Sequence, residues 1–332
     1  MPDDLRPGRP PSIPSNAADT VWVDGAEGVR LRLYRLHGPV NEGPALLWGH
    51  ANGFAAGSYL PWLQRVAEHM PVYAFDARGH GGSDVPPEPY TVNCGADALA
   101  MDLSLLAAAV RAEIGSERPL HFAAHSYTGL AALRLGCVLG ETPWASATLF
   151  EPPLSPTPDQ PAHAIATELA DVLVNGALRR RTDWDSPQAF VDRLSGSKAF
   201  SAWDSDMMAT HGNAILHPKA DGQGYTLACV PEVEAAGYRM TMNTSTFRYA
   251  DRFQCPTTFV ASQPAGEGAT PSWAALVQGL AAERVPGARL VRLPDCGHMM
   301  LFEKPDECLA ELFAGMGYAL SLIHISEPTR PY

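Results

Sequence analysis

The chain has 332 residues, of which 46% are hydrophobic and 18% are charged, so it can build a large globular core. Its formal net charge of −12 argues against a nucleic-acid partner, because phosphate binding requires a basic surface. No run of about 18 apolar residues occurs, so the sequence predicts no membrane span and no membrane partner.

The two ends of the chain fit no regular element. Residues 1–19 are rich in proline and lack the apolar segment of a secretory signal, so we predict a disordered leader. Residues 321–332 are similar to the translated adapter tails of some metagenomic reading frames, and we predict a non-native tail. The six cysteines form no C-x-x-C pair, which predicts free buried thiols and a reducing, cytoplasmic location.

Apolar periodicity predicts alternating strands and helices in the first third of the chain. In order, the expected elements are a hairpin over 20–23 and 29–36, a buried strand over 44–48, a helix over 58–70, a buried strand over 72–75, and a helix over 97–114. The last of these helices stops at Gly115, which is a typical residue just past a helix end.

The stretch LHFAAHSYTGLAAL, residues 120–133, predicts a strand, a tight turn and a helix with Ser126 at the apex. Such a strained turn presents a serine hydroxyl at the carboxyl end of a sheet. Its small neighbours are Ala124 and Thr128, where the Gly-x-Ser-x-Gly pattern has glycines. An ordinary helix capped by serine is the alternative interpretation.

A strand over 145–150 ends at Glu151, and the alternation then lapses. We predict an inserted helical cap over 152–252, with helices over 162–173 and 187–194. Alternation returns with a strand over 257–261, a helix over 271–282, a strand over 290–293 and a helix over 304–315. The pattern predicts an α/β core over 20–151 and 253–320, with a mostly parallel sheet and helices on both faces. An active site is then expected at the carboxyl ends of the strands.

Four motifs, in order along the chain, resemble those of the α/β-hydrolase fold superfamily. They are HANGF at 50–54, FDARGHGGSD at 75–84, AHSYTG at 124–129 and LPDCGHMMLFEKPDE at 293–307. The first is similar to the oxyanion loop of that superfamily, the second to the loop after its fourth strand, the third to its nucleophile elbow and the fourth to its histidine segment. The resemblance covers residues 20–317 and implies an α/β-hydrolase fold.

The resemblance implies that Ser126 is the nucleophile and His298 its general base. A serine hydroxyl needs an adjacent base at neutral pH, and His298 follows the last strand in a loop that can reach back to Ser126. The oxyanion hole is then expected to use the backbone N–H groups of Tyr127 and Asn52. Asn52 also fits plain turn chemistry, because Asn-Gly is a common tight-turn pair.

The acid of the catalytic triad departs from the usual family pattern. Family members commonly carry aspartate shortly after the strand that is here 257–261, but residues 262–268 contain none. Glu151 ends the strand after the elbow, where one branch of the related haloalkane dehalogenases places its glutamate. Glu267 lies in the commoner loop, between glycines. We favour Glu151, because a strand end fixes geometry better than a glycine-flanked loop, and keep Glu267 as the alternative acid.

A serine nucleophile excludes the aspartate-dependent epoxide hydrolases and haloalkane dehalogenases. We predict an enzyme without cofactor or metal that cleaves a small carboxylic ester through an acyl-enzyme, with a small molecule as its only predicted partner. The same constellation supports carbon–carbon bond hydrolysis in aromatic ring-cleavage pathways and also perhydrolysis. A ligand-binding sensor on the same fold is the non-enzymatic alternative.

Overall fold

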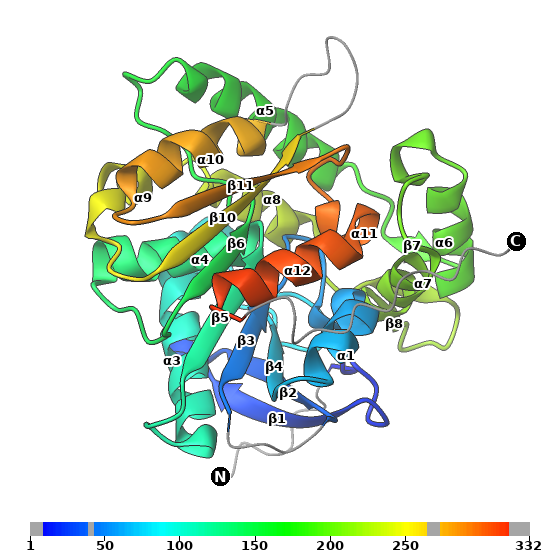
Figure 1. Cartoon of the computed structure of the whole chain (residues 1–332). Helices are drawn as coiled ribbons and strands as arrows, with labels where there is room; N and C mark the ends of the chain where they lie inside the picture. The colour runs from blue at the N-terminus through cyan, green and yellow to red at the C-terminus, as the bar shows by residue number, and fades with distance from the viewer. Residues whose placement is uncertain (1–8, 39–42, 264–272, 319–332) are drawn as a thin grey trace, which may run out of the picture.

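An eight-stranded sheet forms the centre of the structure, a computed structural model that describes residues 9–38, 43–263 and 273–318 (Figure 1). The strands lie in the order β1-β2-β4-β3-β5-β6-β10-β11. The six from β4 to β11 run parallel, whereas β2 pairs antiparallel with both β1 and β4. Their bounds are β1 Ala18–Asp24, β2 Arg30–Leu36, β3 Ala45–Gly49, β4 Val72–Asp76, β5 Leu120–His125, β6 Ala147–Phe150, β10 Thr257–Gln263 and β11 Arg289–Pro294.

Every residue of β3, β4, β5 and β6 is buried, because helices cover both faces of the sheet. Alternate side chains enter two different cores. Leu47 and Phe122 pack with residues of α3 and α4 on one face, whereas Leu46 and Trp48 pack with residues of α1 and α12 on the other. This arrangement confirms the predicted fold class, a mostly parallel sheet between two helical layers.

Figure 1 shows α1 and α12 crossing the front of the sheet, which they contact at β2, β4, β6 and β10. The helices of this part of the chain are α1 Leu60–Ala67, α2 Tyr90–Asn93, α3 Ala96–Ile114, α4 Tyr127–Arg134, α10 Trp273–Arg284, α11 Met300–Glu303 and α12 Pro305–Gly315, with short turns η1 Ala26–Gly28, η2 Ala56–Tyr59 and η3 Leu135–Leu139. The helix predicted from Ser58 is therefore a 3₁₀ turn followed by α1, which has proline in its first turn.

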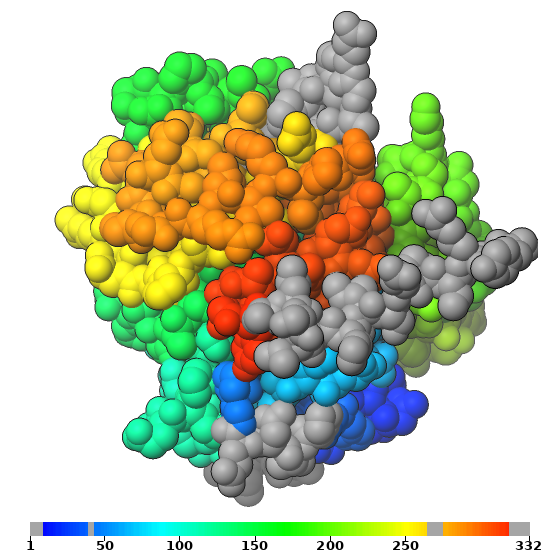
Figure 2. Space-filling view, viewed as in Figure 1, coloured from blue at the N-terminus to red at the C-terminus, as the bar shows by residue number. Residues whose placement is uncertain are grey.

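Residues 152–252 lie between β6 and β10 in sequence, and we refer to them as the insert. Its elements are α5 Ala162–Leu178, β7 Asp183–Trp184, α6 Pro187–Ser195, η4 Lys198–Phe200, α7 Ser205–Ala214, β8 Leu216–Pro218, β9 Tyr225–Leu227, α8 Pro231–Met240, α9 Ser245–Arg248 and η5 Ala250–Arg252. The insert thus adds a small antiparallel sheet, β7-β9-β8, to the predicted helices. Strands of two or three residues are too short to show a periodic pattern. In Figure 2 the insert reaches the surface at the top, in green, and at the right, in light green.

The structure differs from the predicted leader over residues 9–19, because 9–17 pack against the core and β1 already begins at Ala18. Ile13 is fully buried, and the Ser12 hydroxyl donates to Asp76 Oδ1 at 2.8 Å. The Arg9 guanidinium donates to the carbonyl oxygens of Ser83 and Ala228. These contacts hold in place a segment that composition alone predicts to be disordered, because composition does not reveal partners that are distant in sequence. Residues 1–8 and the predicted tail 321–332 lie outside the described residues.

All six cysteines are free and buried, as predicted. Within the described ranges, no helix combines the length and the apolar character needed to cross a bilayer.

Candidate active site

The register of the central strands brings the predicted site residues to one edge of the sheet. Gly49 of β3 pairs with Ala124 of β5, and His125 at the end of β5 pairs with Phe150 at the end of β6. Ser126 and Glu151 therefore leave adjacent parallel strands at the same level. The loop after β11 carries His298 back to this edge, although His298 and Ser126 are 172 residues apart in sequence.

Ser126 lies at the apex of a strained turn between β5 and α4. Its φ of 56° and ψ of −113° are unusual for a residue other than glycine. The turn is held by the Ser126 N–H, which donates to Phe150 O at 2.8 Å, and by the Thr128 hydroxyl, which donates to His50 O at 2.9 Å. A Cβ at Gly49 would collide with the Thr128 side chain. Glycine in the neighbouring strand thus accommodates the threonine that replaces glycine in the turn.

Ser126, His298 and Glu151 form one hydrogen-bonded chain. His298 Nε2 lies 3.1 Å from Ser126 Oγ, and His298 Nδ1 lies 2.6 Å from Glu151 Oε2. A carboxylate only accepts, so Nδ1 carries the proton and Nε2 is free to accept from the serine hydroxyl. Glu151 is completely buried, whereas 34% of the His298 side chain is exposed, toward a cavity.

The surroundings of Glu151 keep its carboxylate charged. Burial alone raises the pKa of Glu151, but the hydrogen bond and the charge of His298, together with hydrogen bonding from Ser262, outweigh it and hold that pKa below its ordinary value. The Ser262 N–H donates to Glu151 Oε1 at 2.6 Å. Ser262 is the penultimate residue of β10, the strand after which the family resemblance led us to expect the acid. In this structure the end of β10 binds the carboxylate of Glu151. Glu267, the alternative acid, lies outside the described residues.

Backbone contacts fix the loop that carries His298. The His125 ring donates from Nε2 to His298 O at 2.9 Å, and the Gly297 N–H donates to Glu303 Oε2 at 2.6 Å. Because these partners bind the main chain on both sides of the ring, they limit where the imidazole can swing. Glu303 was not predicted from the sequence, because its place six residues after Gly297 on a one-turn helix gives no recognisable signal.

The His125 ring is itself oriented by Tyr59. The Tyr59 hydroxyl donates to His125 Nδ1 at 2.7 Å and accepts from the Ala51 N–H at 3.3 Å. Burial lowers the pKa of His125 to about 3, so the ring stays neutral and presents one accepting and one donating nitrogen. Tyr59 therefore links the loop after β3 to the loop of His298. Nothing in the sequence marks this tyrosine.

Asn52 and Tyr127, the predicted oxyanion residues, both line the cavity onto which Ser126 opens. Tyr127 is the first residue of α4, where helical N–H groups lack a partner within the helix. Asn52 lies in a turn with Gly53, whose φ is +74°. Among the described residues, no acceptor takes the backbone N–H of either one.

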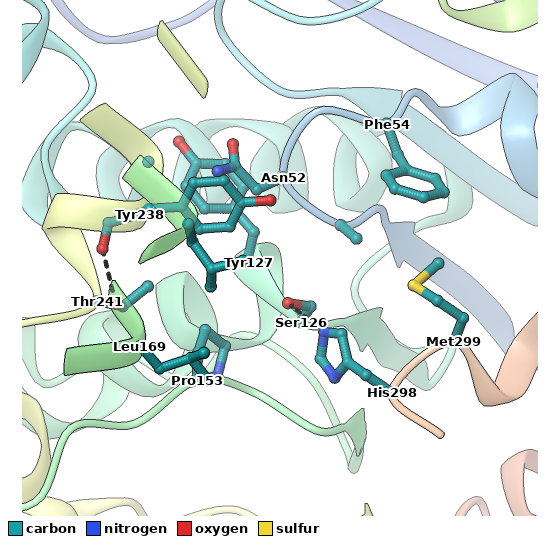
Figure 3. A pocket seen from close by; sticks show the side chains of 13 residues that line it. Asn52, Phe54, Ser126, Tyr127, Pro153, Leu169, Tyr238, Thr241, His298 and Met299 are labelled. Carbon is teal, nitrogen blue, oxygen red and sulfur yellow. Dashed lines mark hydrogen bonds between the residues drawn. The ribbon is translucent and has the colours of Figure 1, made fainter. Parts of the chain in front are cut away.

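The cavity has a volume of about 220 Å³ and an apolar lining. Figure 3 shows Ser126 and His298 pointing into it between Pro153 and Met299, with Asn52 and Tyr238 across the space. The lining residues are Ala51, Asn52, Phe54, Ser126, Tyr127, Pro153, Leu169, Leu173, Gly237, Tyr238, Thr241, His298 and Met299. This lining contains no lysine, arginine, aspartate or glutamate from the described part of the chain. Nor do three His, Cys, Asp or Glu side chains gather anywhere in the described ranges to hold a metal ion.

Comparison with solved structures finds the same fold in enzymes of differing names. The crystal structure of E-2-(acetamidomethylene)succinate hydrolase has a TM-score of 0.70 at 18% identity, covering 91% of this chain and 100% of that one. A bromoperoxidase from Bacillus anthracis has a TM-score of 0.67 at 14% identity, covering 90% and 100%. A malate-bound thermophilic esterase from Thermogutta terrifontis has a TM-score of 0.63 at 17% identity, covering 90% and 98%. Identities this low carry information on the fold alone.

Comparison at the level of sequence gives two results. The search against curated proteins found no match. The model of the alpha/beta hydrolase family matches residues 36–311, which contain Ser126, Glu151 and His298. That match covers most of the chain and agrees with the sheet topology and the turn at Ser126. The chain belongs to the alpha/beta hydrolase family.

Proposed function

We propose that the protein is a serine hydrolase that cleaves a small carboxylic ester through an acyl-enzyme intermediate. Ser126 is the nucleophile, His298 the general base and Glu151 the acid of the triad. The observation that carries this proposal is the hydrogen-bonded chain from Glu151 through His298 to Ser126, which ends at an apolar cavity.

In the first half of the reaction, Ser126 Oγ attacks the ester carbonyl carbon while His298 Nε2 takes the hydroxyl proton. The carbonyl oxygen becomes an anion and accepts hydrogen bonds from the backbone N–H groups of Asn52 and Tyr127. Each such donor is typically worth about 2.7–4 kcal/mol of barrier. The intermediate then collapses, His298 gives its proton to the leaving alcohol, and the acyl group stays on Ser126.

In the second half, water replaces the alcohol. His298 takes a proton from the water as its oxygen attacks the acyl carbon, and the same two N–H groups stabilise the second oxyanion. Collapse breaks the bond to Ser126, which regains its proton from His298, and releases the carboxylic acid. Glu151 remains ionised throughout and stabilises the imidazolium that forms in each half.

The cavity favours a small, uncharged substrate. Its volume of about 220 Å³ lies below the roughly 300–1,000 Å³ of common ligand sites. An acidic substrate would have to bury its carboxylate against an apolar wall without a cationic partner, which is strongly unfavourable. Esters of short acyl chains with a small alkyl or aryl alcohol fit these limits.

One observation favours this proposal over a ligand-binding sensor. A ligand-binding sensor needs no ordered acid, whereas here Glu151 lies 2.6 Å from His298, and loss of such an acid typically lowers turnover roughly 10⁴-fold. Carbon–carbon bond hydrolysis uses the same triad, so substrates and not geometry distinguish it. The test below therefore includes a dienone substrate beside the ester.

The experiment is a rapid-mixing assay with p-nitrophenyl butyrate. Nitrophenolate is a good leaving group, so acylation by this ester should be faster than deacylation, and we expect the wild-type protein to release a burst of about one nitrophenolate per chain. Ser126→Ala should abolish the burst, whereas Ser116→Ala, at an exposed serine, should keep it. Turnover of a ring-cleavage dienone without ester cleavage would replace the proposal with carbon–carbon hydrolysis. Binding of ester and dienone without turnover of either would favour a sensor.

A further inference from the structure

The loop that carries the proposed oxyanion donor is attached to the insert through a side chain. The Asn52 carboxamide donates from Nδ2 to the backbone oxygen of Glu234, in helix α8, at 2.8 Å. Asn52 is only 6% exposed, and 182 residues of sequence separate the two partners. The proposed chemistry uses only the backbone N–H of Asn52, so this contact has no role in it so far.

Helix α8 approaches Asn52 closely because its residue at the contact is glycine. A Cβ at Gly237 would lie 2.5 Å from Asn52 Oδ1 and 2.8 Å from Asn52 Cγ, which is closer than packed atoms allow. Glycine in a helix interior destabilises the helix relative to alanine, and Gly237 is not among the glycines with positive φ. Close approach to the carboxamide is therefore the physical reason for glycine at this position.

A second contact between the same loop and the same helix lies one residue further on. A Cβ at Gly53 would lie 2.7 Å from Glu234 Oε1, so the Glu234 side chain packs directly against the loop. Glu234 is buried, and its other carboxylate oxygen accepts from the Arg180 guanidinium at 2.6 Å. Two glycines, one in the loop and one in the helix, thus allow the loop and α8 to fit together without a gap.

The position of this contact matters for the oxyanion hole. A donor is effective only when its N–H points at the developing anion, within about 0.5 Å and 10–20° of the required geometry. Gly53 in the Asn-Gly turn could adopt many conformations on its own. Its N–H donates to Nε2 of the buried His80 at 3.1 Å, and the Asn52 carboxamide, bound to α8, adds a second restraint at the residue whose N–H is the proposed donor. Gly237 and Tyr238 of α8 also line the cavity, so one helix contacts both the substrate space and the donor.

We propose that Asn52, through its side chain, and Gly237 are positioning residues, which hold the backbone N–H of Asn52 in the direction that the oxyanion requires. The inference rests on the proposed hydrolase function. It assigns helix α8 a part in the chemical step in addition to its place in the pocket wall.

The test compares two glycine-to-alanine variants in helices of the insert. In Gly237→Ala the new methyl group pushes the carboxamide away, whereas in Gly176→Ala of α5 the Cβ would meet no atom within 4 Å. With active sites counted by the nitrophenolate burst, we expect Gly237→Ala to lower kcat about 10²-fold with KM nearly unchanged. A trifluoromethyl ketone, which forms an oxyanion on Ser126, should bind more weakly by a similar factor. Gly176→Ala should match wild type in both.

A double variant separates positioning from general damage to the fold. Asn52→Ala removes the group with which the new methyl would collide, so Asn52→Ala/Gly237→Ala should be no slower than Asn52→Ala alone. A merely structural role would lower the melting temperature and leave kcat per titrated site and ketone affinity unchanged, which would overturn the inference. Wild type that releases no nitrophenolate beyond the Ser126→Ala variant, in the burst or in steady turnover, would instead overturn the proposed function, and the inference with it.

Discussion

The two walls of the cavity are built in different ways. On the sheet side, Ser126, His298 and Glu151 each make directed hydrogen bonds, and strand register determines their positions. On the insert side, Leu169 and Leu173 present apolar surface. The Thr241 hydroxyl donates its hydrogen bond to the backbone oxygen of Tyr238 at 2.7 Å and not to the cavity. For the proposed hydrolase, the difference predicts that the sheet wall and the Asn52 contact of α8 determine the reaction, whereas the α5 part of the insert wall determines which substrate fits. Changes on the sheet side should therefore lower the rate for every substrate, and changes in α5 should alter selectivity.

The largest effect is expected from Glu151→Gln. The amide would donate to His298 Nδ1 and move the ring proton to Nε2, where it can no longer accept from the Ser126 hydroxyl. We expect kcat to fall about 10⁴-fold for every ester, with little change in KM. Steady-state kinetics with p-nitrophenyl acetate and butyrate provides the measurement.

The matched control for this prediction is Glu267→Gln, at the alternative acid. It should retain wild-type kcat, because Glu151 already occupies the acid position beside His298. If Glu267→Gln is the slower of the two variants, the acid has been assigned to the wrong strand. The pair therefore decides between the two glutamates that the sequence leaves open.

The sequence indicated the sheet wall well, because its elements are local. Residues 120–133 carry strand, turn and helix in one stretch, and buried strands such as β4 and β6 appear as apolar runs that end at the site. Glu151 could be favoured because it ends a strand, which fixes geometry better than the glycine-flanked loop of Glu267. The sequence cannot show the Ser262 N–H that binds the carboxylate, since any residue except proline supplies such a group.

The insert wall was largely hidden from the sequence. Its two- and three-residue strands have no detectable period, and Gly237 resembles any helical glycine until its distance to Asn52 is known. Tyr59 was likewise invisible, because its contact with His125 joins residues far apart in sequence. Residues 9–17 were predicted as disordered because composition does not reveal that Ser12 meets Asp76. A contact between residues that are distant in sequence produces no pattern within a short stretch of sequence, whereas a helix or a long strand produces a periodic one.

On the insert side, Leu173→Ala should change selectivity and leave the chemistry intact. The substitution enlarges the cavity at the α5 wall, so longer acyl chains gain room and short ones lose contact. One methylene in an apolar pocket is worth roughly 1–3 kcal/mol, so we expect the ratio of kcat/KM for hexanoate over acetate esters to rise at least about tenfold. Val172→Ala, at the adjacent residue that is 58% exposed, should leave the ratio unchanged. Equal shifts in both variants would contradict a role for this wall.

A smaller effect is expected on the pH dependence of stability. Burial lowers the pKa of His211, in α7 of the insert, to about 3, whereas the ordinary value is 6.5. Between these values the unfolded chain binds a proton that the folded chain does not, so the free energy of unfolding falls as pH decreases from 6.5 toward 3. His211→Gln should reduce this slope by about 1.4 kcal/mol per pH unit.

The same stability measurement compares this histidine of the insert with a histidine beside the active site. His125, on the sheet side, also has a pKa lowered to about 3 by burial, so His125→Gln should reduce the slope equally. Only the sheet-side variant should also lower kcat, because its ring contacts the backbone of His298. Urea unfolding at several pH values between 4 and 7 gives the slopes. Unchanged slopes would mean that these histidines titrate normally in the folded protein.

The smallest effect is expected from Tyr59→Phe, which tests whether the sheet wall depends on contacts behind it. Loss of the hydroxyl leaves His125 Nδ1 without its donor, so only the acceptor His298 O still favours the tautomer with the proton on Nε2, and the ring is held less firmly. One hydrogen bond is worth about 1 kcal/mol, and we expect kcat to fall by a factor of about five. Tyr73→Phe removes a hydroxyl that donates to Glu113 at 2.9 Å, away from the site, and should reduce stability alone. If both variants lower kcat by the same factor, the loss comes from a general weakening of the sheet. If Tyr59→Phe reacts at the wild-type rate, the contact between Tyr59 and His125 does not contribute to the position of His298.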